Sequence, residues 1–172
     1  MAKSQSKKLV SEKLSKELLG LAGEYAVASE LCRRGLYSQL TLGNHKRTDI
    51  LIESNTKMIR ISVKAKQGKE WLTGKEIFRD DDFLILVDFQ DKNLNDSLDF
   101  YIINKSYWSV MIKDEVERKK DRIEKVENDV IYFKNGYKGM NVQVKHVLDY
   151  KNKWNLITSI VHPKETITET EK

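Results

Sequence analysis

The side chains in this sequence best suited to chemistry are two acids and a lysine: Glu24, Asp49 and Lys64. Carboxylates bind hard divalent cations such as Mg²⁺, and a bound cation lowers the pKa of water and neutralises phosphate oxygens. A lysine beside them can orient the attacking water or stabilise developing negative charge. Together these residue types predict a site that holds a metal ion and a phosphate group.

Asp49 and Lys64 fall on two predicted strands, at residues 49–53 and 58–66, with a turn at 54–57 between them. Side chains alternate between the two faces of a strand. In the second strand the apolar residues therefore share one face, and the polar and cationic residues share the other: Arg60, Ser62, Lys64 and Lys66. The strand pair thus predicts one core face and one face that presents Lys64 near Asp49.

Glu24 falls in a predicted helix of about residues 10–34, which we expect to break at Gly20 and to end at Gly35. The apolar residues expected to face the core recur at helical spacing: Leu14, Leu18, Leu21, Val27, Ala28 and Leu31. Glu24 shares the face of the last three. An acid on the apolar face of a helix must find a cation, a donor or a metal.

The whole pattern predicts one domain, residues 9–160, between disordered ends at 1–8 and 161–172. Further strands are expected at residues 36–42, 82–89, 100–103 and 130–133, the last in a hairpin around Asn135-Gly136, with 68–82 irregular. Further helices are expected at about 107–119, capped by Ser106, and from Asn141 onward; if the first of these continues into the charged segment after it, that part would be mostly solvated. A central mixed β-sheet flanked by helices, α/β or α+β in class, is the simplest way to bury these elements.

The net charge of +5 is unevenly distributed along the chain. Residues 1–70 hold 14 Lys and Arg against 7 Asp and Glu, whereas the rest of the chain holds 17 against 19. This bias favours a polyanionic partner, nucleic acid first, although a solvated basic surface explains it equally well. The basic turn His45-Lys46-Arg47, just before Asp49, has the same two interpretations.

Two further features bear on location. Apolar runs such as residues 83–87 are far too short to cross a bilayer, so no membrane association is expected. A single cysteine, Cys32, excludes an intramolecular disulfide and favours a reducing cytoplasm.

The order and spacing of these residues resemble the PD-(D/E)XK, or restriction-endonuclease-like, nuclease superfamily, including Holliday-junction resolvases. The matching motifs are Glu24 in GEYAVASEL, Asp49 in TDILIE and Ser62-Val63-Lys64 in RISVKAKQ, and the resemblance covers about residues 18–158. It implies a restriction-endonuclease-like core and a metal-dependent DNA endonuclease, with a homodimer expected by analogy.

The resemblance also implies a role for each residue. Asp49 would be the primary ligand of Mg²⁺ or Mn²⁺, the Val63 backbone carbonyl a second ligand, and Glu24 a ligand directly or through water. Lys64 would orient the attacking water or stabilise the developing charge. The residues expected to contact DNA are His45, Lys46, Arg47, Arg60, Lys66 and Lys69.

The sequence departs from the family at Ser62, where an acid is usual. A serine hydroxyl is neutral and a poor Mg²⁺ ligand, so Glu24 supplies the lost charge, or the metal binds weakly, or the site is inactive. Glu53 shares the Asp49 face of its strand, but it lies four residues, about 13 Å, further along, which is too far to substitute.

Other interpretations of the same residues remain open. The chain is alternatively an inactive nuclease-fold subunit that binds DNA or supports assembly, or a protein-interaction module built on residues 113–129. Glu24 is alternatively a structural partner of Lys64 or Arg60, Asp49 a turn residue, and Lys64 an edge-strand charge.

Overall fold

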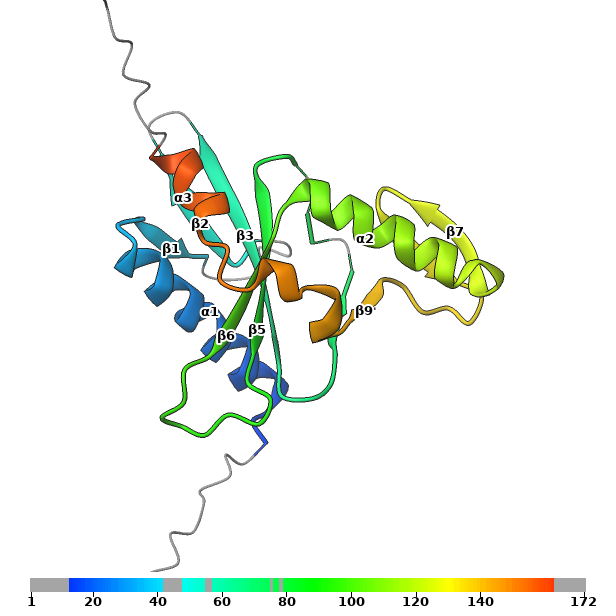
Figure 1. Ribbon diagram of the computed structural model, residues 1–172, viewed down its shortest axis with the longest axis horizontal. Helices are drawn as coiled ribbons and strands as arrows, with labels where there is room; N and C mark the ends of the chain where they lie inside the picture. The colour runs from blue at the N-terminus through cyan, green and yellow to red at the C-terminus, as the bar shows by residue number, and fades with distance from the viewer. Residues whose placement is uncertain (1–12, 42–47, 55–56, 75, 78, 163–172) are drawn as a thin grey trace, which may run out of the picture.

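Residues 13–41, 48–54, 57–74, 76–77 and 79–162 are described in the computed structural model of the chain (Figure 1). In these ranges the helices are α1 (Lys16–Arg33), α2 (Lys105–Arg118) and α3 (Asn155–Val161), with short 3₁₀ helices η1 (Lys120–Arg122), η2 (Val144–His146) and η3 (Leu148–Tyr150). The strands are β1 (Ser38–Leu40), β2 (Ile50–Glu53), β3 (Met58–Lys66), β4 (Trp71–Thr73), β5 (Asp82–Asp88), β6 (Asp99–Ile103), β7 (Ile123–Glu127), β8 (Val130–Phe133) and β9 (Met140–Val142). None of the described helices is both long enough and apolar enough to cross a membrane.

Within the described residues, five strands form the central sheet in the order β1-β2-β3-β5-β6. β3 and β5 are parallel, and the other neighbouring pairs are antiparallel. β5 is buried along its whole length, as its unbroken apolar sequence predicts for a strand covered on both faces. The mixed sheet and its flanking helices confirm the predicted fold class.

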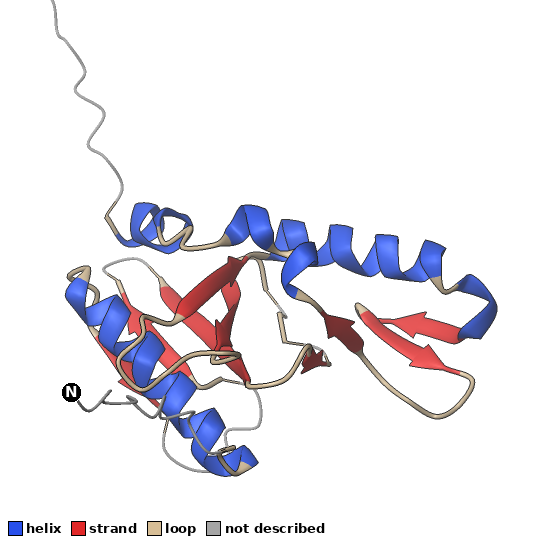
Figure 2. Cartoon of the chain, turned by 60° about the horizontal axis from the view of Figure 1, so that its bottom comes forward, coloured by secondary structure: helices blue, strands red, loops and turns tan. Residues whose placement is uncertain are grey.

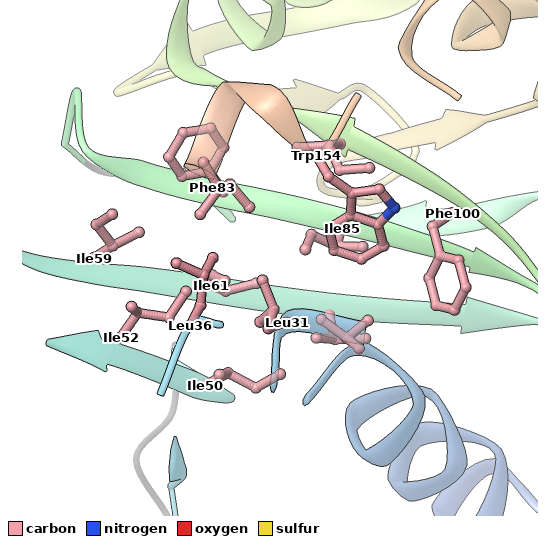
Figure 3. Packing of buried hydrophobic residues seen from close by; sticks show 14 of the residues in the cluster. Leu31, Leu36, Ile50, Ile52, Ile59, Ile61, Phe83, Ile85, Phe100 and Trp154 are labelled. Atoms are coloured by element: carbon pink, nitrogen blue, oxygen red, sulfur yellow. The ribbon is translucent and has the colours of Figure 1, made fainter. Parts of the chain in front are cut away.

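Helices cover the sheet on both faces. On one face, Val27 and Leu31 of α1 and Ile157 of α3 pack against apolar residues of β2, β3, β5 and β6. Figure 3 shows part of this cluster, including Trp154 and Phe100, whose ring centroids lie 5.3 Å apart. The other face packs against α2, β8 and β9, through residues such as Trp108, Met111, Ile131 and Val142. Figure 2 shows α2 extending beyond the central sheet toward the β7–β8 hairpin.

The boundaries of α1 follow from its capping residues. Ser15 is the N-cap, and its hydroxyl accepts a hydrogen bond from the N–H of Leu18 at 3.2 Å. Gly35 has a positive φ of 77° just past the C-cap, which is where glycine ends a helix at low cost. The predicted end is therefore confirmed. The predicted break at Gly20 is wrong, because the helix continues through it.

The first apolar set of α1 does not face the core. Leu14, Leu18 and Leu21 are 36%, 57% and 46% exposed. The buried residues of this helix are Gly23, Val27 and Leu31. Helical spacing describes both faces of α1, so periodicity alone could not select the one that contacts the sheet.

The start of α2 also differs from the prediction. Its N-cap is Asn104, not Ser106, and the Asn104 side chain accepts a hydrogen bond from the N–H of Tyr107 at 3.0 Å. The charged segment after α2 does not continue the helix. It forms β7, which pairs antiparallel with β8.

One turn precedes β8 and another follows it. The β7–β8 hairpin turns at Asn128 and Asp129, with positive φ of 51° and 59°, a conformation that these two residue types tolerate. The turn predicted at Asn135-Gly136 is confirmed, because the chain returns along β8 with an antiparallel bridge between Tyr132 and Lys138, and the Phe133 N–H donates to the Tyr137 carbonyl at 2.9 Å. The helix expected from Asn141 is wrong, because that residue lies in β9 and the last helix begins at Asn155.

Candidate active site

A cleft of about 960 Å³ opens between α1 and the C-terminal end of β3. Glu24, Asp49, Val63 and Lys64 all line it. These four residues come from three segments: Glu24 from α1, Asp49 from the position just before β2, and Val63 and Lys64 from β3. The structure therefore brings the two acids and the lysine to one place.

Asp49 is the residue just before β2, and it lies beside β3. Its Oδ2 accepts a hydrogen bond from the backbone N–H of Val63 at 2.6 Å, and its own N–H donates to the Ile61 carbonyl at 2.9 Å. The N–H and C=O of one residue in a strand point to the same side. The Val63 carbonyl is therefore directed toward the side on which Asp49 lies, as the predicted second ligand would be.

The Asp49 carboxyl is destabilised as an anion. Burial raises the pKa of Asp49 and the charge on Glu76 adds to the rise, whereas the Val63 N–H and the Lys64 ammonium oppose it. A cation bound at the cleft would favour the ionised form.

Glu24 reaches the cleft from α1. A Cβ added to the preceding residue, Gly23, would lie 2.9 Å from the Ala65 Cβ, so the helix approaches β3 closely at this point. Burial raises the pKa of Glu24, and the charge on Asp49 raises it further. Within the described part of the chain, no ion pair joins Glu24 to Lys64, whose pairing is with another acid.

That acid is Glu76, which the sequence did not single out. The Nζ of Lys64 lies 3.6 Å from Oε2 of Glu76, in the segment between β4 and β5. The other carboxylate oxygen accepts a hydrogen bond from the N–H of Gly74 at 2.9 Å, and the side chain is 13% exposed. Glu76 lies in a stretch without periodicity, so nothing but its residue type marked it in the sequence.

Ser62 does not occupy the place of a metal ligand. It is 3% exposed, and its hydroxyl donates a hydrogen bond to the backbone carbonyl of Glu76 at 3.3 Å. Among the described residues that line the cleft, Ser62 is not included. Its contact instead holds the segment that carries Glu76.

Lys66 was expected to contact DNA, and its environment argues against that role. Its side chain is 2% exposed, and its ammonium lies 2.7 Å from Oδ1 of Asp88 and 2.9 Å from Oε1 of Gln90. It also lies over the ring of Trp71, 4.5 Å from the centroid. We therefore no longer expect Lys66 to contact DNA, because these contacts hold its charge inside the fold.

The other predicted DNA contacts have different surroundings. Arg60 is half-buried, with Nη1 3.7 Å from Oδ1 of Asp82. Lys69 is exposed, between two residues that line the cleft, Gly68 and Glu70. His45, Lys46 and Arg47 lie outside the described residues.

Three lysines that the sequence prediction left out also line the cleft, and one of them, Lys92, is paired with Asp99. Lys13 and Lys16, both exposed, stand at the start of α1. In the sequence, Lys13 and Lys16 were marked only as part of the basic excess of the first 70 residues. Their position gives the cleft a positive wall near its acids.

The donor set fits a hard divalent cation. Glu24 and Asp49 offer carboxylate oxygens, the ligands that Mg²⁺ and Mn²⁺ prefer. In the segments that the structure describes, no three acidic, histidine or cysteine side chains are grouped closely enough to hold a metal ion. Mg²⁺ is commonly bound by one or two carboxylates, with water and phosphate oxygens completing its shell, and Glu24 and Asp49 would supply that number.

The fold is similar to that of a nuclease of known structure. The chain superposes on the structure of a bacterial homing endonuclease, I-Ssp6803I, with a TM-score of 0.50 and 13% identity, covering 87% of this chain and 95% of that chain. No family model matches this chain, and no curated protein matches it either. At this identity the likeness shows the fold alone: the α+β core of this chain is nuclease-like.

Proposed function

We propose that the chain is a metal-dependent DNA endonuclease with a PD-(D/E)XK-type site. The observation that carries this proposal is that Glu24, Asp49 and Lys64 line one cleft of about 960 Å³. The nuclease-like fold supports it, because a homing endonuclease has a similar architecture.

The geometry suits each residue to one role. Asp49 has Oδ2 engaged with Val63, so Oδ1 is the atom we assign to a divalent cation, with Glu24 as its companion. A bound cation would lower the pKa of water and neutralise the phosphate charge. Lys64 would orient the attacking water and stabilise the charge that develops on the phosphorane.

DNA would be held by the positive wall of the cleft. Lys13 and Lys16 line that wall, and the exposed Lys69 lies beside it. We also keep His45, Lys46 and Arg47 as proposed contacts on the evidence of the sequence. Cleavage of both strands by one kind of site implies two copies related by a two-fold axis, so we propose a homodimer.

The test is cleavage of linear, supercoiled and branched DNA by the purified protein with Mg²⁺ or Mn²⁺. We expect cleavage that EDTA abolishes, that is lost in Asp49→Asn, and that is reduced in Lys64→Ala to a slow rate measurable over long incubations. Glu53→Gln is the matched control, because Glu53 is an exposed acid at the far end of β2. Cleavage that persists in Asp49→Asn would exclude this site as its source.

The second candidate is a nuclease-fold subunit that binds DNA without cutting it. Ser62 favours it, since a buried hydroxyl replaces the usual acid two residues before Lys64. This candidate predicts binding at low salt, weakening steeply as salt rises, with every DNA substrate left intact. Absence of DNA binding even at low salt contradicts both candidates.

A further inference from the structure

The sequence lacks an acid at position 62, and the structure places another carboxylate, that of Glu76, beside Lys64. We propose that Glu76 is a positioning residue for Lys64, and that it replaces from the β4–β5 segment the carboxylate that position 62 lacks. This inference rests on the proposed nuclease function, and it concerns the same site.

Glu76 contacts Lys64 directly. Oε2 of Glu76 is 3.6 Å from the Lys64 ammonium, while Lys64 also lines the cleft. Glu76 is not among the described residues that line the cleft, so this ion pair links a cleft residue to the β4–β5 segment. A carboxylate there restricts the flexible lysine side chain.

Glu76 is itself held in place by two hydrogen bonds. Oε1 accepts the N–H of Gly74 at 2.9 Å, which fixes the orientation of the carboxylate. The backbone carbonyl of Glu76 accepts the hydroxyl of Ser62 at 3.3 Å. A side chain fixed at both its backbone and its carboxylate is suited to positioning a partner.

Ser62 lies two residues before Lys64 in β3. Ser62 and Lys64 share one face of β3, so an acid at position 62 would lie about 7 Å along the strand from Lys64. The short serine instead leaves room for the backbone at residue 76 to approach this face. The charge near Lys64 is thereby supplied from another segment of the chain.

The electrostatics agree with this geometry. The charge on Glu76 contributes to the raised pKa of Asp49, so Glu76 lies within the field of the same site. The negative charge expected from position 62 is therefore present beside Asp49 and Lys64.

The experiment is a double-mutant cycle on single-turnover cleavage, with Glu76→Gln, Lys64→Ala and the double variant. Glu76→Gln should lower the cleavage rate by about 10–100-fold, the usual effect of removing a group that orients a site residue, with little change in DNA affinity. In the Lys64→Ala background, Glu76→Gln should add no further loss, since it acts through Lys64. An equal loss in both backgrounds would overturn the inference.

A rescue and a control sharpen the result. Ser62→Glu combined with Glu76→Gln should recover the rate, because it returns a carboxylate to the face of Lys64, whereas a folded but equally slow double variant contradicts the replacement. Thermal melting identifies any variant that fails to fold. Glu53→Gln removes an exposed acid elsewhere and should leave the rate unchanged.

One measurement does not depend on cleavage. The ammonium proton signal of Lys64 in lysine-selective NMR, assigned through Lys64→Arg, should be visible in the wild type and weakened in Glu76→Gln. If the wild type cuts no DNA, the proposed function fails, and this signal still decides whether Glu76 holds Lys64. A Lys64 signal identical in both proteins overturns the inference.

Discussion

The carboxylate of Asp49 accepts a hydrogen bond from the backbone N–H of Val63 at 2.6 Å. The bond joins the acid of the candidate site to the strand that carries Lys64. One carboxylate oxygen of Asp49 thus binds the backbone of β3, and the other is the oxygen proposed to bind a metal ion. A single side chain therefore has a structural role and a proposed catalytic role, and mutation can separate them.

Asp49→Asn and Asp49→Ala are expected to separate these two roles. The asparagine oxygen can still accept a hydrogen bond from the Val63 N–H, so the free energy of unfolding should change by less than about 1 kcal/mol. Alanine leaves that N–H unpaired, which should lower the free energy of unfolding by roughly 1–3 kcal/mol. Both variants should lose cleavage. Urea unfolding with cleavage assays checks this, and equal destabilisation by the two substitutions would refute the structural role.

Glu24→Gln should change stability in a pH-dependent way. The pKa of Glu24 is raised from 4.5 by burial and then by the Asp49 charge, so the stability it contributes is lost as the pH rises through its folded value. Above that pH, Glu24→Gln should be more stable than the wild type, and the difference should vanish below pH 4.5. Urea unfolding across this range measures the difference.

Glu17→Gln, on the same helix, is the matched control. The pKa of Glu17 is lowered, first by a backbone N–H and then by Ser15, so its stabilising contribution is present above its unfolded pKa. Glu17→Gln should therefore be less stable than the wild type in the higher pH range, where Glu24→Gln is more stable than the wild type. The same sign for both variants would contradict the burial argument for Glu24.

Lys66→Met should destabilise the fold by about 3–5 kcal/mol, because it leaves the charge of Asp88 buried without its partner. Lys69→Met, an exposed position three residues along, should change stability by less than roughly 0.5 kcal/mol and should weaken DNA binding. Chemical unfolding and binding titrations test the pair. A stable Lys66→Met protein would show that the Lys66–Asp88 contact contributes little.

Gly23→Ala should push α1 away from β3. Its Cβ would approach the Ala65 Cβ to 2.9 Å, and such overpacking costs about 1–3 kcal/mol. Because Glu24 is the next residue, cleavage should fall as well. Gly20→Ala is the control on the same helix: apart from its chain neighbours and the nearby backbone of its own helix, no atom of the described residues lies within 4 Å of the added Cβ, so the variant should gain up to about 1 kcal/mol in unfolding free energy.

Strand positions were predictable where the pattern was local. The alternation of residues 58–66 and the apolar run at 82–88 gave strands that agree with β3 and β5, and Gly35 marked the end of α1. Local patterns failed where two interpretations fit the same spacing. Both faces of α1 are apolar at helical intervals, and the charged segment after α2 formed β7 by pairing with a strand further along the chain.

The candidate site divides in the same way. The sequence alone identified Glu24, Asp49 and Lys64 as candidates, because their residue types and their places on predicted elements suit the proposed chemistry. The tertiary structure alone decided that Glu76 contacts Lys64, that Ser62 supports Glu76, and that Lys66 is buried against Asp88. The reason is physical. Backbone alternation and helical periodicity are set by near neighbours, whereas the partner of a charge and its exposure to water depend on which distant segments pack around it.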